Sequence, residues 1–148
     1  MQYKGTIIQG FEGLRLERYQ DQRGIWTIGY GHLWKPGDPL SCTYAQALEW
    51  LDADVGVAEN CINTHVLPTV SITQNQFDAL VSLTYNIGTG AFLSSTVYRE
   101  TCKKDFPRAS LAFLEWDKIT VDGKLVSDPG LLRRRIAERY LFDTPEDA

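Results

Sequence analysis

The sequence lacks the features that mark a disulfide-rich, membrane-spanning or nucleic-acid-binding protein. Only three of its 148 residues are cysteine, an odd number that cannot pair completely within one chain. No apolar run approaches the ~18 residues of a membrane span, and the first residues form no apolar run long enough for a signal peptide. A net charge of −4 and a pI near 5.1 argue against a general binder of nucleic acid or membrane surfaces.

The three cysteines, Cys42, Cys61 and Cys102, have a spacing that matches no metal-binding or redox motif. We therefore expect small buried thiols, as in a protein made in a reducing cytosol. A bridge between Cys42 and Cys61 stays open at this point.

The composition is that of a single globular domain spanning residues 1–148. Apolar residues make up 43% and charged residues 23% of the chain, and no repeat or linker divides it. Four Trp, seven Tyr and six Phe supply many aromatic rings. These rings can pack in the core, or a few of them can line a sugar-binding cleft.

A small antiparallel sheet is predicted near the N-terminus. A helical pattern over residues 3–11 ends at Gly13, which can adopt a left-handed conformation. The next segment contains short β-favouring pieces separated by glycines, at residues 16–19, 25–28 and 30–34. A loop is expected over residues 35–39.

Helices are predicted for the rest of the chain, so the fold class is α+β and mostly helical. The forms Thr43-x-x-Gln46 and Thr73-x-x-Gln76 are typical of capping boxes. They predict helices from Thr43 to about residue 63 and from Thr73 to Gly88. Further helices are expected over residues 95–104, 107–118 and 131–141, with a polar loop over 120–129 that can contain a β-turn at Asp122-Gly123.

Glu12, Asp21 and Thr27 form the candidate catalytic group. If residues 22–24 are a three-residue hairpin loop with Gly24 left-handed, Thr27 lies opposite Tyr19 and projects to the same side as Asp21. Glu12 can approach that side across a short turn. Two carboxylates and a hydroxyl can protonate a leaving group and direct a water, which is what glycoside hydrolysis requires.

Each of the three groups has a distinct expected role. The apolar neighbours of Glu12 favour a protonated acid, and the polar neighbours of Asp21 favour a carboxylate. Thr27 can orient a water beside Asp21. Taken singly, Glu12 could instead cap or pair, Asp21 could start a turn, and Thr27 could serve only as a β-former. The combination is the specific signal.

The catalytic segment of the phage-type lysozymes (glycoside hydrolase family 24) resembles the run from Phe11-Glu12-Gly13 to Trp26-Thr27-Ile28-Gly29-Tyr30-Gly31-His32. Residues 74–92 are similar to the central helix of that family. Residues 130–139 are similar to its C-terminal motif Gly-Leu-x-x-Arg-Arg-x-x-Glu, with Trp116 at the usual interval before it. The resemblance covers almost the whole chain.

This resemblance implies a small N-terminal lobe and connecting helix over residues 12–60. It also implies a helical lobe formed by residues 61–148 with the N-terminal helix, and a saccharide groove between the lobes. Leu33, Tyr85 and Ser95 match groove positions, although Leu33 and Tyr85 could simply pack and Ser95 could cap a helix. His32 is expected to be structural, paired with an acid of the helical lobe.

Two further features lie toward the C-terminus. Arg133, Arg134, Arg135 and Arg139 concentrate positive charge, and most of them are expected to form a solvated helix face. Residues 119–129 depart from a shorter, glycine-rich stretch of the family, which affects the expected shape of one groove wall.

The function implied is that of a muramidase, which hydrolyses the β-1,4 bond between N-acetylmuramic acid and N-acetylglucosamine in bacterial peptidoglycan. Glu12, Asp21 and Thr27 would act in inverting geometry, with no metal or organic cofactor. The biological role implied is that of a phage endolysin for host-cell lysis. We expect a monomer without nucleic-acid partners or membrane insertion, held in the host cytoplasm until a separate holin gives access to the wall.

Two alternatives stay open from the sequence. A lysozyme-like module could bind glycan or a protein partner with little catalysis. A lytic transglycosylase would close the muramic ring instead of adding water, and it would have less need of Asp21 and Thr27.

Overall fold

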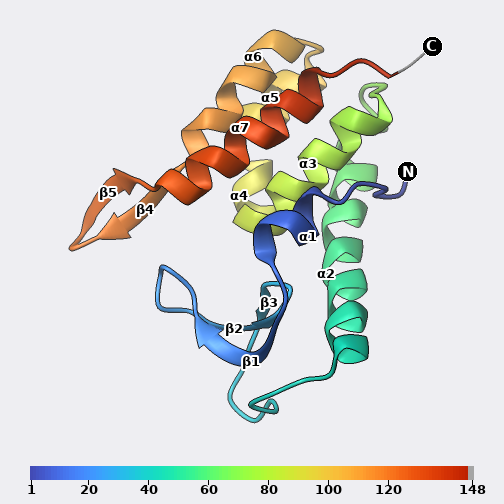
Figure 1. The fold of residues 1–148 in the computed structure, drawn as a ribbon. Helices are drawn as coiled ribbons and strands as arrows, with labels where there is room; N and C mark the ends of the chain where they lie inside the picture. Colours follow the sequence, from blue (N-terminus) through green and yellow to red (C-terminus); the bar gives the residue numbers. More distant parts are fainter. Residues whose placement is uncertain (147–148) are drawn as a thin grey trace.

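The computed structural model describes residues 1–146 and places a small antiparallel sheet at one end of a helical body (Figure 1). The short helix α1 (Ile7–Glu12) leads into the strands β1 (Arg15–Gln20), β2 (Trp26–Gly29) and β3 (His32–Leu33). The remaining elements are α2 (Tyr44–His65), α3 (Gln74–Ile87), α4 (Thr89–Leu93), α5 (Thr96–Cys102), α6 (Phe106–Ala112), the 3-10 helix η1 (Phe113–Trp116), β4 (Lys118–Val121), β5 (Lys124–Ser127) and α7 (Pro129–Asp143). The predicted α+β, mostly helical class is confirmed.

The first hairpin has the predicted register. Tyr19 pairs with Thr27, and the Asp21 N–H donates to the Ile25 carbonyl at 2.9 Å. Gly24 has a φ of 77°, the left-handed conformation that the three-residue loop needs. Asp21 and Thr27 therefore come from opposite strands of one hairpin.

A second hairpin replaces the predicted loop over residues 120–129. Its strands β4 and β5 are joined at Asp122-Gly123, where φ is 51° and 77°. Positive φ at both central residues is the signature of a type I′ turn, whose twist matches that of the flanking strands. The possible turn at this dipeptide is confirmed, but the loop around it was wrong because β-branched Ile119 and Val121 alternate with polar residues.

Several helix boundaries also differ from the prediction, two of them by the most residues. The first helix begins at Ile7 and not at residue 3, because the backbone N–H groups of Tyr3 and Lys4 donate to side chains of Glu59 and Asp78 instead. The helix predicted over residues 107–118 ends in a 3-10 turn, and Lys118 already belongs to β4.

The predicted caps mark the starts of α2 and α3. Thr73 and Gln76 form a full capping box at the start of α3. The Thr43 hydroxyl accepts the Gln46 N–H at 3.1 Å at the start of α2. Each cap satisfies N–H groups that the first helical turn otherwise leaves without partners.

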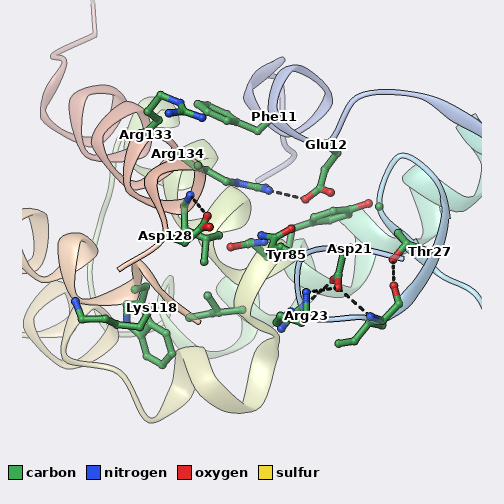
Figure 2. A pocket seen from close by; sticks show the side chains of 18 of the residues that line it. Phe11, Glu12, Asp21, Arg23, Thr27, Tyr85, Lys118, Asp128, Arg133 and Arg134 are labelled. Atoms are coloured by element: carbon green, nitrogen blue, oxygen red, sulfur yellow. Dashed lines mark hydrogen bonds and ion pairs between the residues drawn. The ribbon is translucent and has the colours of Figure 1, made fainter. Parts of the chain in front are cut away.

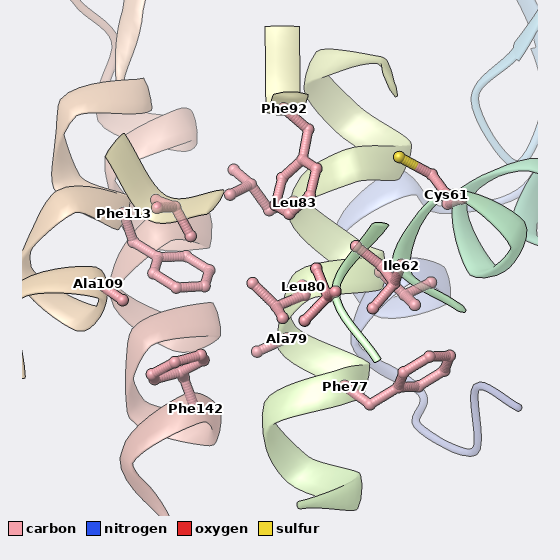
Figure 3. Packing of buried hydrophobic residues seen from close by; sticks show 14 of the residues in the cluster. Cys61, Ile62, Phe77, Ala79, Leu80, Leu83, Phe92, Ala109, Phe113 and Phe142 are labelled. Carbon is pink, nitrogen blue, oxygen red and sulfur yellow. The ribbon is translucent and has the colours of Figure 1, made fainter. Parts of the chain in front are cut away.

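Helix α3 lies in the middle of the hydrophobic core. Phe77, Leu80 and Leu83 are fully buried, and Figure 3 shows them between α2 on one side and Phe113 and Phe142 on the other. Burying each side chain of this size stabilises the fold by about 1.5–3 kcal/mol. The core thus holds α3 rigidly, and the last turn of α3 carries Tyr85 toward the candidate site.

The cysteines are all free, so the possible bridge between Cys42 and Cys61 is not formed. Cys61 is buried as predicted, whereas Cys42 and Cys102 are half-buried. Across residues 1–146, every helix is too short or too polar to cross a lipid bilayer.

Candidate active site

A groove of about 810 Å³ opens between the first sheet and the C-terminal part of the helical body. Five of the six predicted site residues line it, and each comes from a different segment of the chain. Figure 2 shows the labelled side chains around the cavity. Those five are Glu12, Asp21, Thr27, Leu33 and Tyr85.

Glu12 is the last residue of α1 and points across the groove toward α7 (Figure 2). Its Oε1 accepts from Nη1 of Arg134 at 2.5 Å, and its side chain is 16% exposed. Its Oε2 lies over Gly31, where an added Cβ would collide with the carboxyl group. The apolar surroundings expected for Glu12 therefore contain a cation that the sequence argument missed.

Asp21 is held by the backbone of its own loop. Its Oδ1 accepts the N–H groups of Arg23 at 2.8 Å and Ile25 at 3.0 Å. The Arg23 guanidinium lies 3.4 Å from Oδ2. These donors agree with the predicted polar setting, and they fix the carboxylate while its side chain stays 19% exposed to the groove.

Thr27 lies on β2 and is only 6% exposed. Its hydroxyl donates to the Ile25 carbonyl at 2.9 Å. Because that bond uses the single hydroxyl proton, the remaining lone pairs of Oγ1 can only accept. Thr27 thus offers an acceptor to a polar molecule in the groove.

Tyr85 lies in the middle of the cavity, beneath the pair formed by Glu12 and Arg134 (Figure 2). Its hydroxyl donates to the Tyr30 carbonyl at 2.5 Å, which ties α3 to the first sheet. Burial raises the pKa of the Tyr85 phenol, and the Glu12 carboxylate adds to that increase. Leu33 is 52% exposed at the same groove and could contact a ligand there.

Ser95 does not join these residues. It is 3% exposed, and its hydroxyl accepts the Tyr98 N–H at 3.1 Å and donates to the Phe92 carbonyl at 2.6 Å. Ser95 therefore caps α5 and has no place in the groove lining. This is the helix-capping alternative that the sequence left open for Ser95.

The C-terminal arginines differ most from the prediction. Arg134 and Arg135 are 4% and 0% exposed, so these two do not belong to a solvated helix face. Both lie against Glu138, at N–O distances of 3.2 Å and 2.7 Å. Burial lowers the pKa of Arg134, but Glu138 and Glu12 outweigh it and the net shift is upward. The spacing of Glu138, four residues after Arg134 and three after Arg135, is the sequence feature that could have indicated these ion pairs.

His32 has the structural pairing that was expected. Its Nδ1 lies 2.6 Å from Oδ2 of Asp54, and its ring stacks on Trp50 at 4.6 Å between centroids. Asp54 belongs to α2, the connecting helix, and not to the helical lobe named in the prediction. The pair joins the first sheet to α2.

Other lining residues were not identified from the sequence. They comprise aromatic rings, cations and one acid around the rim and floor of the groove: Phe11, Tyr19, Arg23, Trp116, Lys118, Asp128, Arg133 and Arg134. The aromatic count left open whether rings pack in the core or line a cleft, and Phe11, Tyr19, Tyr85 and Trp116 line this groove. Among residues 1–146, no cluster of three or more His, Cys, Asp or Glu side chains could hold a metal ion.

The arrangement suits acid-assisted cleavage of a glycosidic bond. Lysozyme-like glycoside hydrolases work in this way: one carboxyl group protonates the departing sugar, and a second group manages the water or the developing cation. We assign the fold and its groove to that class. The chain belongs to the phage lysozyme family, whose model matches residues 9–138.

Individual relatives agree over nearly the full length. An endolysin of Acyrthosiphon pisum secondary endosymbiont phage 1 is 41% identical over 139 residues, which cover 94% of each protein. The solved endolysin from Escherichia coli O157:H7 phage FAHEc1 matches with a TM-score of 0.86 and 39% identity, over 97% of this chain and 94% of that one. The muramidase domain of SpmX from Asticaccaulis excentricus matches with a TM-score of 0.83 and 37% identity, over 94% and 93%. The predicted family and lysozyme-type enzyme class are confirmed.

Proposed function

We propose that this lysozyme, a phage peptidoglycan hydrolase for host-cell lysis, cleaves the β-1,4 bond from N-acetylmuramic acid to N-acetylglucosamine. Glu12 is the general acid, Asp21 is the general base, and Thr27 holds the attacking water. Leu33 and Tyr85 are groove residues that contact the sugar chain. No metal or organic cofactor takes part in this scheme.

The contacts of Glu12 support its role as the acid. Arg134 occupies Oε1, which leaves Oε2 as the oxygen that can carry a proton. Oε2 lies over Gly31, a lining residue of the groove. The proton is therefore presented toward the cavity and can pass to the glycosidic oxygen as the bond breaks.

The observation that carries the proposal is the orientation of Thr27. Its hydroxyl proton is engaged by the Ile25 carbonyl, so Oγ1 must accept a hydrogen bond from any water beside it. A water that donates one hydrogen to Thr27 and the other to Asp21 directs an oxygen lone pair into the groove. Asp21 can then take the proton that the water loses on attack.

In the proposed reaction, water replaces the leaving sugar in a single step as the glycosidic bond breaks. The water oxygen bonds to the anomeric carbon, one water proton goes to Asp21, and the Glu12 proton goes to the leaving oxygen. Proton exchange with solvent then restores both carboxyl groups. A single displacement inverts the anomeric centre, so the newly formed reducing end is the α-anomer.

The test compares Glu12→Gln with the native chain in a turbidity assay on outer-membrane-permeabilised bacteria. We expect the rate of clearing to fall by about 10²–10⁴-fold, the usual contribution of a general acid. Glu49→Gln, on the exposed side of α2, is the matched control and should clear at the native rate. Equal, negligible clearing by the native and Glu12→Gln proteins would support a binding module instead.

Product analysis separates hydrolysis from its closest chemical rival. NMR of the first product should show the α-anomer before mutarotation, and mass spectrometry should show added water. Anhydro-muropeptides would instead identify a lytic transglycosylase.

The monomeric state and the route to the wall form the rest of this proposal. Light scattering of the purified protein tests the monomer. Expression with and without a pore-forming holin tests whether lysis requires that second protein.

A further inference from the structure

A buried cluster of charges lies directly behind Glu12. Arg135 and Glu138 are fully buried on α7, and Arg134 is 4% exposed beside them. Removing charges from water costs several kcal/mol per ion, and apolar residues of similar volume often stabilise a fold as well or better. A contribution to stability therefore explains this cluster poorly. Its contacts indicate a different role, which is to position Glu12.

Arg134 contacts two glutamates through one guanidinium group. Its Nη1 donates to Glu12 at 2.5 Å, and its Nε donates to Oε2 of Glu138 at 3.2 Å. The guanidinium is planar and rigid, so the direction of Nε sets the direction of Nη1. Nη2 of Arg134 also donates to the carbonyl and hydroxyl oxygens of Ser82, at 3.4 Å and 3.5 Å. Glu138 and Ser82 together therefore determine where Arg134 can hold Glu12.

Glu138 is itself held from two further sides. The Ser82 hydroxyl on α3 donates to Oε2 at 2.5 Å, and the Arg135 Nε lies 2.7 Å from Oε1. Because α3 is the central core helix and Ser82 is fully buried on it, Ser82 ties the cluster to the centre of the core. Glu138 has no exposed surface and does not line the groove, so it can act on a substrate only through Arg134.

We propose that Glu138, oriented by Ser82 and Arg135, is a positioning residue for the general acid. It sets the plane of the Arg134 guanidinium, which in turn fixes Oε1 of Glu12 and keeps Oε2 over Gly31. This inference rests on the proposed function, because it takes Glu12 as the acid. Displacing a reacting group by about 1 Å can cost 10²-fold in rate, so a support at this distance from the groove can matter.

The main test is Ser82→Ala, with Ser110→Ala as the matched control. Both serines are buried, and Ser110 also links an acid and an arginine of α7, since its hydroxyl donates to Asp143 at 2.8 Å and accepts from Arg139 at 3.0 Å. Neither partner of the Ser110 hydroxyl belongs to the cluster behind Glu12. On a purified soluble peptidoglycan fragment, we expect Ser82→Ala to lower kcat by about tenfold with KM unchanged. Ser110→Ala should keep the native kcat.

Glu138→Gln is the second variant, and we expect a larger kcat loss from it because the charge itself is removed. Thermal unfolding provides a readout that needs no activity. The shift in Tm caused by Ser82→Ala should be smaller in a Glu12→Gln background than in the native chain, since the two sites share one network. The shift caused by Ser110→Ala should be the same in both backgrounds.

The outcomes separate this inference from the proposed function. Equal kcat for the two serine variants, or additive Tm shifts for Ser82→Ala and Glu12→Gln, would overturn the positioning role. A native chain that hydrolyses nothing, but retains the coupled Tm shifts, would overturn the proposed function and leave the link from Glu138 through Arg134 to Glu12 supported.

Discussion

The two hairpins that border the groove are built in different ways. The β1–β2 hairpin is backed by β3 and by α2, and it buries Thr27 and Ile28 on β2. The β4–β5 hairpin is a separate two-stranded sheet whose second strand is exposed throughout, with Leu125 71% exposed. Figure 1 shows it extending away from the helical body. Catalytic groups need the firm backing that β3 and α2 give to the β1–β2 hairpin. A groove wall can be formed by an exposed hairpin such as β4–β5.

Each hairpin also depends on one aspartate, but in a different place. Asp21 accepts two N–H groups within its own loop, so it is fixed where it faces the groove. Asp117 lies at the base of the second hairpin, where Ser127 donates to it at 2.6 Å and Lys118 at 2.5 Å. One aspartate is thus available for chemistry, and the other serves as an anchor.

The largest expected difference in activity is between aspartate-to-asparagine substitutions in the loops of the two hairpins. Asp21→Asn keeps an acceptor oxygen for the loop N–H groups but loses the base, so hydrolysis should fall by about 10²–10⁴-fold. Asp122→Asn should change nothing measurable, because Asn-Gly suits a type I′ turn as well as Asp-Gly does. Turbidity rates and thermal unfolding check both. Comparable losses from the two variants would contradict the difference drawn between the hairpins.

The next effect tests how closely the first sheet approaches Glu12. Gly31→Ala places a Cβ against the carboxyl group, and we expect a loss of activity approaching 10²-fold as Glu12 is displaced. Gly37→Ala is the control, since Gly37 also has positive φ but an added Cβ there meets nothing within 4 Å. The control should be destabilised yet active. Full activity of Gly31→Ala would show that Glu12 can work from elsewhere.

A smaller effect is expected at the anchor of the second hairpin. Hydrogen bonds from Lys118 and Ser127 lower the pKa of Asp117. The folded pKa is below the unfolded one, so this stabilisation is present above the unfolded pKa and is lost as pH falls through the folded pKa. Asp117→Asn should cost about 1 kcal/mol at neutral pH.

Hydrogen exchange of β4 and β5, followed as a function of pH, checks this prediction. The native hairpin should lose protection in acid, and the Asp117→Asn variant should show little of that dependence. Protection that is equal in both proteins at neutral pH would remove Asp117 as the anchor.

The smallest effect is expected at the exposed face of the second hairpin. Leu125→Ser should change the free energy of unfolding by no more than about 0.5 kcal/mol, because the side chain is 71% exposed. Clearing of permeabilised cells should proceed at the native rate. A marked decrease in kcat/KM would mean that this hairpin contacts the substrate directly.

Local sequence was sufficient to predict features that depend on residues close together in the chain. The spacing of Asp21 and Thr27 around Gly24 predicted a hairpin of the correct register, because side chains alternate and the loop length sets the pairing. Capping sequences predicted the starts of α2 and α3 for a similar reason. Local sequence left two roles open for Ser95, since the same residue type serves both helix caps and ligands, and the structure shows the cap.

By itself, the sequence determined the family, the fold class and the set of polar groups available for hydrolysis, since these depend on residue type and short-range spacing. Only the tertiary structure decided that Arg134 meets Glu12, a residue 122 positions away, and that Glu138 is buried behind them. Burial and ion pairing depend on which distant segments pack together. An arginine on a helix has the same local pattern whether it faces solvent or a catalytic acid.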